Sequence, residues 1–492
     1  MPLPMLNADS SPTSKSDQVM RPHVWLLDLS TTRGGRRAVV AVGVVVLALG
    51  VWYAAQTYFR YDEWAFWTFR RDLLNAGGEK NLIRFFFSAQ GGSPYGGAMP
   101  AGLMALWLPL DWIFGMHVYW PYALPTMVLH VLAGVLMFEL LARWLRPNVA
   151  LATSGLFLIM GNAASVITYG WLVNFVAPLA AIFIVLLAIV RLEHRRERAM
   201  VSVTLGATLA AISFSNVGLV AATVVAVAYA LRRRLALAGV HLGAVIAVFA
   251  IWRAFYEPPG VPVRLGESGR YLEFAWNGLT TAGGDLVGLA WTPVGVLVLI
   301  AAAAGGAWSW WERDPASIVN IPTLVGAGVF YGMVAVRGVD LPTTSFSFDQ
   351  DRYLYIATAL LLPSIAWLVN RAISIRAWVA WPALLLLVWA VSLNLGHSRE
   401  AVDDQVALGI SNRITIETAA SLVGHLEPLD DGILVADHSA RFTVEQFKIL
   451  YEQGKVPCVA DFGLAVTFTQ DQRTFSPEHW MLAPTPDQVS CP

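Results

Sequence analysis

Charged residues are scarce in this chain of 492 residues. Only 14% are Asp, Glu, Lys or Arg, whereas 56% are hydrophobic, and the mean hydropathy is +0.56. Because soluble domains carry roughly 25% charged residues, this balance argues against a soluble protein. The chain has no basic stripe with interleaved aromatics, so nucleic-acid binding has no support. It also has no internal repeat at a fixed period, which excludes a solenoid and weakens an inverted-repeat transporter.

Cysteine is nearly absent as well. The two cysteines, Cys458 and Cys491, lie close to the carboxyl end. In an oxidising compartment they could form a disulfide that closes a loop of about 34 residues, worth roughly 3–4 kcal/mol. Two unrelated thiols fit the sequence equally well. Neither cysteine has a histidine at metal-ligand spacing, so we predict no zinc site.

Long apolar stretches are what the sequence does contain. Several reach the roughly 18–20 residues that cross a hydrocarbon core about 30 Å thick. We therefore predict an all-α polytopic membrane protein with about eleven transmembrane helices. The predicted spans are 38–58, 119–141, 149–163, 172–190, 200–215, 217–231, 235–255, 285–304, 317–336, 353–370 and 376–394.

The stretch 99–115 decides the topology. It has about a dozen apolar residues before Asp111 and contains Pro100 and Pro109, which is typical of an interfacial or re-entrant helix. When it is not counted as a span, all arginine clusters of the alternate loops fall on one side, as the positive-inside rule requires. The amino terminus is then inside and the carboxyl terminus outside. These arginines are Arg33, Arg36, Arg37, Arg143, Arg146, Arg191, Arg195, Arg196, Arg198, Arg232, Arg233, Arg234, Arg313, Arg371 and Arg376.

The chain divides into three predicted regions. Residues 1–37 are rich in Ser, Pro and Asp and indicate a disordered cytoplasmic tail. Residues 38–396 form the membrane domain in a bacterial-type plasma membrane, with a large first outer loop at 59–118. Residues 397–492 are more polar, with alternating helix-like and strand-like stretches, and predict a small extracytoplasmic α/β domain.

Two adjacent carboxylates follow the first span. A helix over 38–58 is about 30 Å long at 1.5 Å per residue, so Asp62 lies about one turn beyond the outer hydrocarbon edge. Asp62 and Glu63 precede Trp64 and Trp67. Partial desolvation by these rings would raise a carboxylate pKa and suit a general base. Solvation of the helix end is the structural alternative.

The surrounding motifs resemble the GT-C superfamily of membrane glycosyltransferases. A first span that ends in Tyr61-Asp62-Glu63 is followed by Leu106-Trp107 through Phe114-Gly115, similar to the family's interfacial helix ending in Phe-Gly. His130 then lies in the next span, as in the family. Near the carboxyl end, Asp351-Arg352-Tyr353-Leu354-Tyr355 is similar to its Arg-Tyr-Leu-Tyr segment. The likeness covers roughly 55–200 and 340–370.

This resemblance implies a reaction. The donor would be a polyprenyl-phosphate-linked monosaccharide, and the acceptor a hydroxyl of an extracytoplasmic glycan, lipid or protein. Asp62, with Glu63 beside it, would act as general base. Arg352 would bind the phosphate of the leaving group, since a guanidinium grips phosphate oxygens bidentately; snorkelling to lipid phosphates is the alternative. Further candidates for phosphate binding are Tyr353, Arg264, Arg270 and Arg337.

One departure from the family concerns metal binding. Many relatives have a second acidic motif after the third span, but residues 161–174 contain no carboxylate here. The sequence therefore identifies no cofactor, and a divalent cation such as Mg²⁺ or Mn²⁺ is a candidate only. Asp349 and Asp351 could substitute from another loop, for the acceptor or for a metal. His130, near the middle of a span, is a catalytic candidate or a hydrogen-bonded structural residue.

Two other functions fit parts of the sequence. A transporter or flippase for a lipid-linked sugar would need polar or broken helices near the bilayer midplane, and mainly His130 meets that description. A noncatalytic cell-envelope assembly subunit would use the outer domain to bind a partner, and the missing acidic motif is compatible with it. The acids and arginines cluster at the outer edge, which favours the glycosyltransferase.

Overall fold

The computed structural model describes most of the membrane region and part of the carboxyl-terminal region. The described residues are 31–60, 63–64, 66–88, 99–192, 196–256, 268–289, 291–339, 347, 349–421, 433–437 and 440–457. Asp62, Arg264 and both cysteines lie outside them, as does the chain before residue 31. The predictions made for these residues therefore stay predictions.

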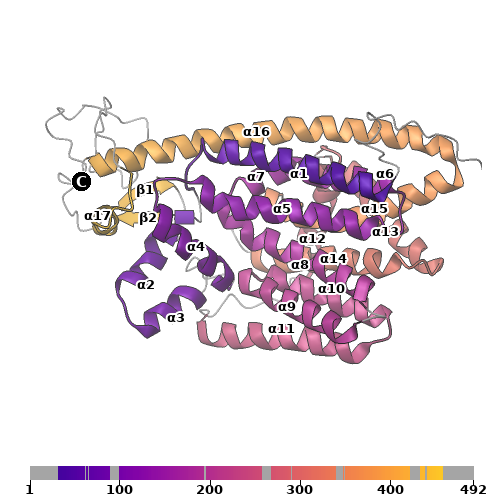
Figure 1. Cartoon of the computed structure of the whole chain (residues 1–492), viewed down its shortest axis with the longest axis horizontal. Coiled ribbons are helices and arrows are strands. Elements are labelled where there is room, and N and C mark those ends of the chain that lie inside the picture. Colours follow the sequence, from indigo (N-terminus) through magenta and orange to yellow (C-terminus); the bar gives the residue numbers. More distant parts are fainter. Residues whose placement is uncertain are drawn as a thin grey trace, which may run out of the picture.

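Helices make up almost all of the described chain (Figure 1). The apolar helices and their neighbours are α1 (Thr32–Ala54), α5 (Trp120–Leu141), α6 (Pro147–Ile159), α7 (Gly161–Ile167), η4 (Gly170–Leu172), α8 (Val173–Leu192), α9 (Glu197–Phe214), α10 (Val217–Leu231), α11 (Leu235–Tyr256), α12 (Ser268–Leu286), α13 (Thr292–Trp311), α14 (Ser317–Gly338), α15 (Asp351–Ile375), η6 (Ala377–Val379) and α16 (Ala380–Ser421). The first outer loop contains η2 (Phe66–Arg70), α2 (Arg71–Asn75), α3 (Glu79–Phe87) and α4 (Ala101–Phe114).

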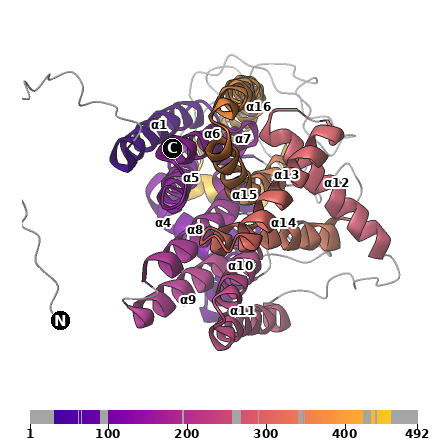
Figure 2. The ribbon, with the colours of Figure 1, turned by 90° about the vertical axis from the view of Figure 1, so that its right-hand side faces the viewer.

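The prediction of a multi-pass membrane protein is confirmed. In the described residues, eight helices are long and apolar enough to cross a membrane, or nine if the bent pair α6 and α7 is one span. Each of the eleven predicted spans overlaps a helix, but α9 and α10 are not among these candidates. The number eleven therefore stays a prediction. Viewed along the bundle, α8, α14 and α15 lie in its middle, whereas α1, α11 and α16 lie at its edge (Figure 2).

One predicted span was placed wrongly. The stretch 285–304 was predicted as one helix, but α12 ends at Leu286 and α13 begins only at Thr292. Between them the backbone turns at Gly288, whose φ is +72°, a conformation that residues with a side chain rarely adopt. Asp285 therefore belongs to the last turn of α12, which is not among the candidate spans.

Two arginines that were predicted to lie on the cytoplasmic side of the membrane gather at one carboxylate. Arg36 of α1 and Arg191 of α8 both bind the carboxylate of Glu139 in α5, the latter at 2.6 Å. Glu139 thus joins three helices. The gathering agrees with the predicted topology, although the side of the membrane stays a prediction.

The carboxyl-terminal region continues from the last apolar helix without a break. Helix α16 has 42 residues and is therefore about 63 Å long at 1.5 Å per residue, about twice a hydrocarbon core. The boundary predicted at 396–397 falls inside it. Strands β1 (Ile433–Asp437) and β2 (Ala440–Thr443) form an antiparallel pair, followed by α17 (Val444–Glu452). Figure 1 shows these elements at the same end of the molecule as α2, α3 and α4.

Candidate functional site

The chain that follows α1 is enclosed by aromatic rings. Phe59 is fully buried, and its ring centroid lies 5.3 Å from that of Trp67, 5.1 Å from that of Tyr119 and 5.0 Å from that of Tyr122. Trp64 is also fully buried. These aromatic residues therefore form a packed cluster between the first outer loop and α5, which holds the end of the first span in one place.

Glu63 is a fully buried carboxylate whose two oxygens both have partners. Oε2 accepts a hydrogen bond from the backbone N–H of Arg60 at 2.9 Å. Oε1 accepts one from the Tyr119 hydroxyl at 2.7 Å and one from the backbone N–H of Trp171 at 3.3 Å. Burial raises the pKa of Glu63 to about 7, against the opposing charge of Arg60. Glu63 thus has a structural role, and its catalytic role stays a prediction.

Arg60 completes this arrangement, and our reading of the sequence missed it. Its side chain is fully buried, with NH2 donating to the carbonyl of Thr168 at 2.7 Å and NH1 to that of Gln405 at 3.3 Å. Its guanidinium carbon also lies 5.3 Å from the centre of the Tyr169 ring. An arginine that precedes two carboxylates by two and three residues was the available signal. Arg60 and Glu63 fix the described chain on either side of Asp62.

Helix α7 links this cluster to a second group of acids. Its Ser165 hydroxyl donates to the carboxylate of Asp351, and its Asn162 side-chain N–H donates to Asp285 at 2.6 Å. Residues 162 and 168 are about 9 Å apart along the helix axis at 1.5 Å per residue. The segment in which we expected, and did not find, an acidic motif therefore receives two carboxylates from other helices.

Asp285 was not predicted as a site residue. Its carboxyl group is partly buried at the end of α12, beside Asp351 at the start of α15. Burial raises the pKa of Asp285 to about 7, and the negative charge of Asp351 adds to this effect. A carboxyl group with this pKa exchanges protons near neutral pH, so it can accept or donate a hydrogen bond there.

The predicted phosphate-binding residues lie near the connection between α14 and α15. Arg352 has its guanidinium carbon 5.1 Å from the centre of the ring of the buried Tyr353. Arg270 is exposed and donates from NH2 to the carbonyl of Val339 at 3.2 Å. Arg337, two residues before Val339, is exposed as well. Their predicted binding to phosphate stays a prediction.

The exposed Asp349 lies two residues before Asp351. In the part of the chain that the structure describes, no group of three or more His, Cys, Asp and Glu side chains is placed to hold a metal ion. The predicted Mg²⁺ or Mn²⁺ site at Asp349 and Asp351 thus stays untested.

His130 is buried in α5 and connects three helices. Its Nδ1 lies 2.9 Å from the Tyr355 hydroxyl in α15, and its Nε2 lies 3.2 Å from the carbonyl of Leu158 in α6. A carbonyl can only accept, so we assign the proton to Nε2, and Nδ1 then accepts from Tyr355. The neutral imidazole satisfies both partners, which gives His130 a structural role. Its catalytic role stays a prediction.

Comparison with solved structures gives a likeness, whereas comparison with sequences gives none. No protein-family model matches the chain, and no curated protein matches it. It is similar to the crystal structure of ArnT from Cupriavidus metallidurans bound to undecaprenyl phosphate, with 14% sequence identity over 79% of this chain and 80% of that one. The TM-score is 0.49. A likeness at this level says nothing by itself about activity or ligands here.

Proposed function

We propose that this membrane protein is a glycosyltransferase of the GT-C type. It transfers a monosaccharide from a polyprenyl-phosphate donor to a hydroxyl group of a glycan, lipid or protein outside the cytoplasm. The support comes from the multi-pass helical architecture and from the Tyr61-Asp62-Glu63 and Arg352-Tyr353 motifs. Asp62 and Arg352 are the residues that we expect to act on the substrates.

The observation that carries this proposal is the buried anchoring of the residues on both sides of Asp62. Arg60 and Glu63 are both fully buried and both bind the segment between α7 and α8, through Thr168 and Trp171. A chain end that only solvated a helix would not need two buried ionisable anchors, because burying such groups is costly. The arrangement suits a catalytic group that must be held in a fixed position.

The reaction follows from these positions. Asp62 takes the proton of the acceptor hydroxyl as its oxygen attacks the anomeric carbon of the donor sugar. The bond between that carbon and the phosphate oxygen breaks, and the electron pair leaves with the polyprenyl phosphate. Arg352 stabilises the negative charge that develops on this leaving group. Asp285 and Asp351, held by α7, accept hydrogen bonds from other hydroxyls of the acceptor.

The test is Asp62→Asn, measured in membranes supplied with a panel of polyprenyl-phosphate monosaccharides. We expect sugar transfer and release of polyprenyl phosphate to be lost, while expression and folding stay normal. Glu79→Gln is the matched control, because it neutralises an exposed carboxylate of the same outer loop. Full activity of Asp62→Asn would refute the mechanism. Mass spectrometry of cell-envelope glycans after deletion of the gene would identify the product.

A further inference from the structure

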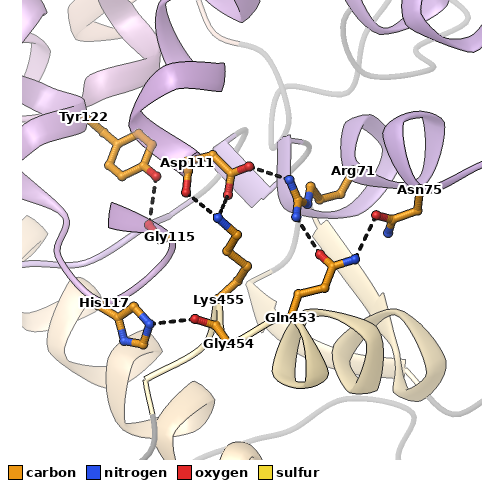
Figure 3. Close-up of polar contacts among 9 residues, drawn as sticks. All are labelled: Arg71, Asn75, Asp111, Gly115, His117, Tyr122, Gln453, Gly454 and Lys455. Atoms are coloured by element: carbon orange, nitrogen blue, oxygen red, sulfur yellow. Dashed lines mark hydrogen bonds and ion pairs between the residues drawn. The ribbon is translucent and has the colours of Figure 1, made fainter. Parts of the chain in front are cut away.

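Part of the carboxyl-terminal region binds the first outer loop through buried charges (Figure 3). Asp111 of α4 is fully buried and forms an ion pair with Arg71 of α2, whose side chain is 9% exposed. Lys455 follows α17, and its side chain is 17% exposed. Its Nζ lies 3.5 Å from Oδ1 of Asp111 and donates to the backbone carbonyl of Asp111 at 2.7 Å. Gln453 accepts from Arg71 at 2.5 Å. Two cations therefore share one buried carboxylate.

This contact reaches the site through the turn after α4. The backbone N–H of Met116 donates to the carbonyl of Lys455 at 2.7 Å, while the carbonyl of Met116 accepts from the Tyr58 hydroxyl at 2.8 Å. Tyr122 donates to the carbonyl of Gly115 at 2.8 Å. The turn is thus held by Lys455 on one side and by Tyr58 and Tyr122 on the other, and Tyr58 lies two residues before Arg60.

The extension of α16 contacts the same chain directly. Asn412 donates from Nδ2 to the carbonyl of Phe59 at 2.9 Å. The carbonyl of Gln405 accepts from the Thr57 hydroxyl at 3.0 Å and from Arg60. The side-chain oxygen of Gln405 accepts from the Thr168 hydroxyl at 2.6 Å. Each of the residues 57–60 therefore contacts the carboxyl-terminal region, either directly or through Met116.

We propose that Lys455 and Asn412 are positioning residues, through which the described parts of 397–457 hold Tyr58–Arg60 in the arrangement that sugar transfer requires. The inference rests on the proposed function, since Arg60 is one of the two anchors beside Asp62. It makes the carboxyl-terminal region part of the site. Lys455 acts through Met116 and Tyr58, and Asn412 acts directly on the backbone of Phe59.

The first experiment needs no substrate. Hydrogen exchange is followed by mass spectrometry on the purified full chain in detergent, for peptides that cover 55–60 and 112–118. We expect Lys455→Met to speed exchange in both peptides and Asn412→Ala to speed it in the first, each on the order of 10-fold or more. Lys80→Met is the matched control, because it removes the charge of an exposed lysine in α3; it should change neither peptide.

The second experiment measures transfer by the same variants. We expect kcat to fall on the order of 100-fold in both variants, because small displacements of a catalytic group are costly, with KM for the donor unchanged. Lys455→Arg restores the charge and should recover most of the activity. Normal kcat together with faster exchange would overturn the proposal, as would unchanged exchange. If Lys455→Met fails to fold, Asn412→Ala decides, since it removes one hydrogen bond and leaves the charges intact.

The two proposals can fail separately. If the wild type transfers no sugar from any donor in the panel, the proposed function fails. Faster exchange at 55–60 in the variants would then still establish the contact, but its catalytic purpose would be refuted. If the wild type is active and Asp62→Asn is not, while Lys455→Met and Asn412→Ala match the wild type, only the positioning role fails.

Discussion

Replacing Asp111 with Asn tests the buried charge network that joins the carboxyl-terminal region to the first outer loop. The change keeps the shape of the side chain and removes its charge, so Arg71 and Lys455 lose their common counter-charge. Arg71 is 9% exposed and Asp111 is fully buried. Removing one partner of a buried ion pair costs about 3–5 kcal/mol, whereas an exposed pair contributes about 0–1 kcal/mol. We therefore expect the variant to lose about 3–5 kcal/mol of stability.

The measurement is the free energy of unfolding in mixed detergent micelles, compared between wild type and variant. A double-mutant cycle with Lys455→Met separates this pair from its surroundings. Because the residues share one network, we expect the double variant to lose less stability than the summed single effects, by about 1 kcal/mol or more. A cost below about 1 kcal/mol for Asp111→Asn, or strictly additive effects, would refute the reasoning.

Four further predictions follow from the described contacts. Glu63→Gln should impair folding as well as activity, because its amide N–H meets the backbone N–H of Arg60 in one orientation and that of Trp171 in the other; a stably folded Glu63→Gln protein would contradict this, and circular dichroism with size-exclusion chromatography tests it. Burial raises the pKa of Asp285 from 3.8 to about 7, so the folded state binds more protons than the unfolded state and stability falls as pH rises across that window. Asp285→Asn should remove this loss. Its free energy of unfolding should therefore rise by a few kcal/mol at pH 8, at about 1.4 kcal/mol per pKa unit, and change little at pH 4. Equal changes in the free energy of unfolding at both pH values would argue against this prediction. Gly115→Ala should cost about 1–3 kcal/mol, because Gly115 has φ +52° and an added Cβ would lie 3.0 Å from the Lys455 carbonyl oxygen; thermal unfolding measures this, and an unchanged midpoint would count against the turn geometry. A reporter fused after Pro492 should signal from outside the cytoplasm, and a cytoplasmic signal would show that the predicted number of spans is off by one.

The sequence predicted the features that depend on local composition. Long apolar runs such as that of α8 form helices in lipid, because a helix bonds every backbone polar group within its own segment. The interruptions by Pro100 and Pro109 likewise identified α4 as a short helix. Within 397–492, where strand-like stretches were predicted, Ile433–Asp437 forms β1. These elements are visible because residues near one another in the chain determine them.

The contacts that build the site could not be predicted in this way. Arg60 meets Gln405 across 345 positions of sequence, and Asn412 meets Phe59 across 353. No composition or periodicity records which residue lies opposite another at that separation. Asp285 was missed for a different reason, since its apolar neighbours favoured a membrane helix and hid the turn at Gly288. The carboxylates of the second acidic group are supplied by the tertiary fold rather than by one motif.

The length of α16 has a mechanical consequence. One helix about 63 Å long begins next to a predicted inner loop and carries Gln405 and Asn412 to the chain that follows α1. Helices adapt to a thinner or thicker bilayer by tilting. Because α16 is continuous, a tilt at its lipid-facing half would displace its distal half as a lever does. The acyl-chain length of the surrounding lipid would then affect how tightly α16 holds Phe59 and Arg60, so the proposed sugar transfer should respond to membrane thickness.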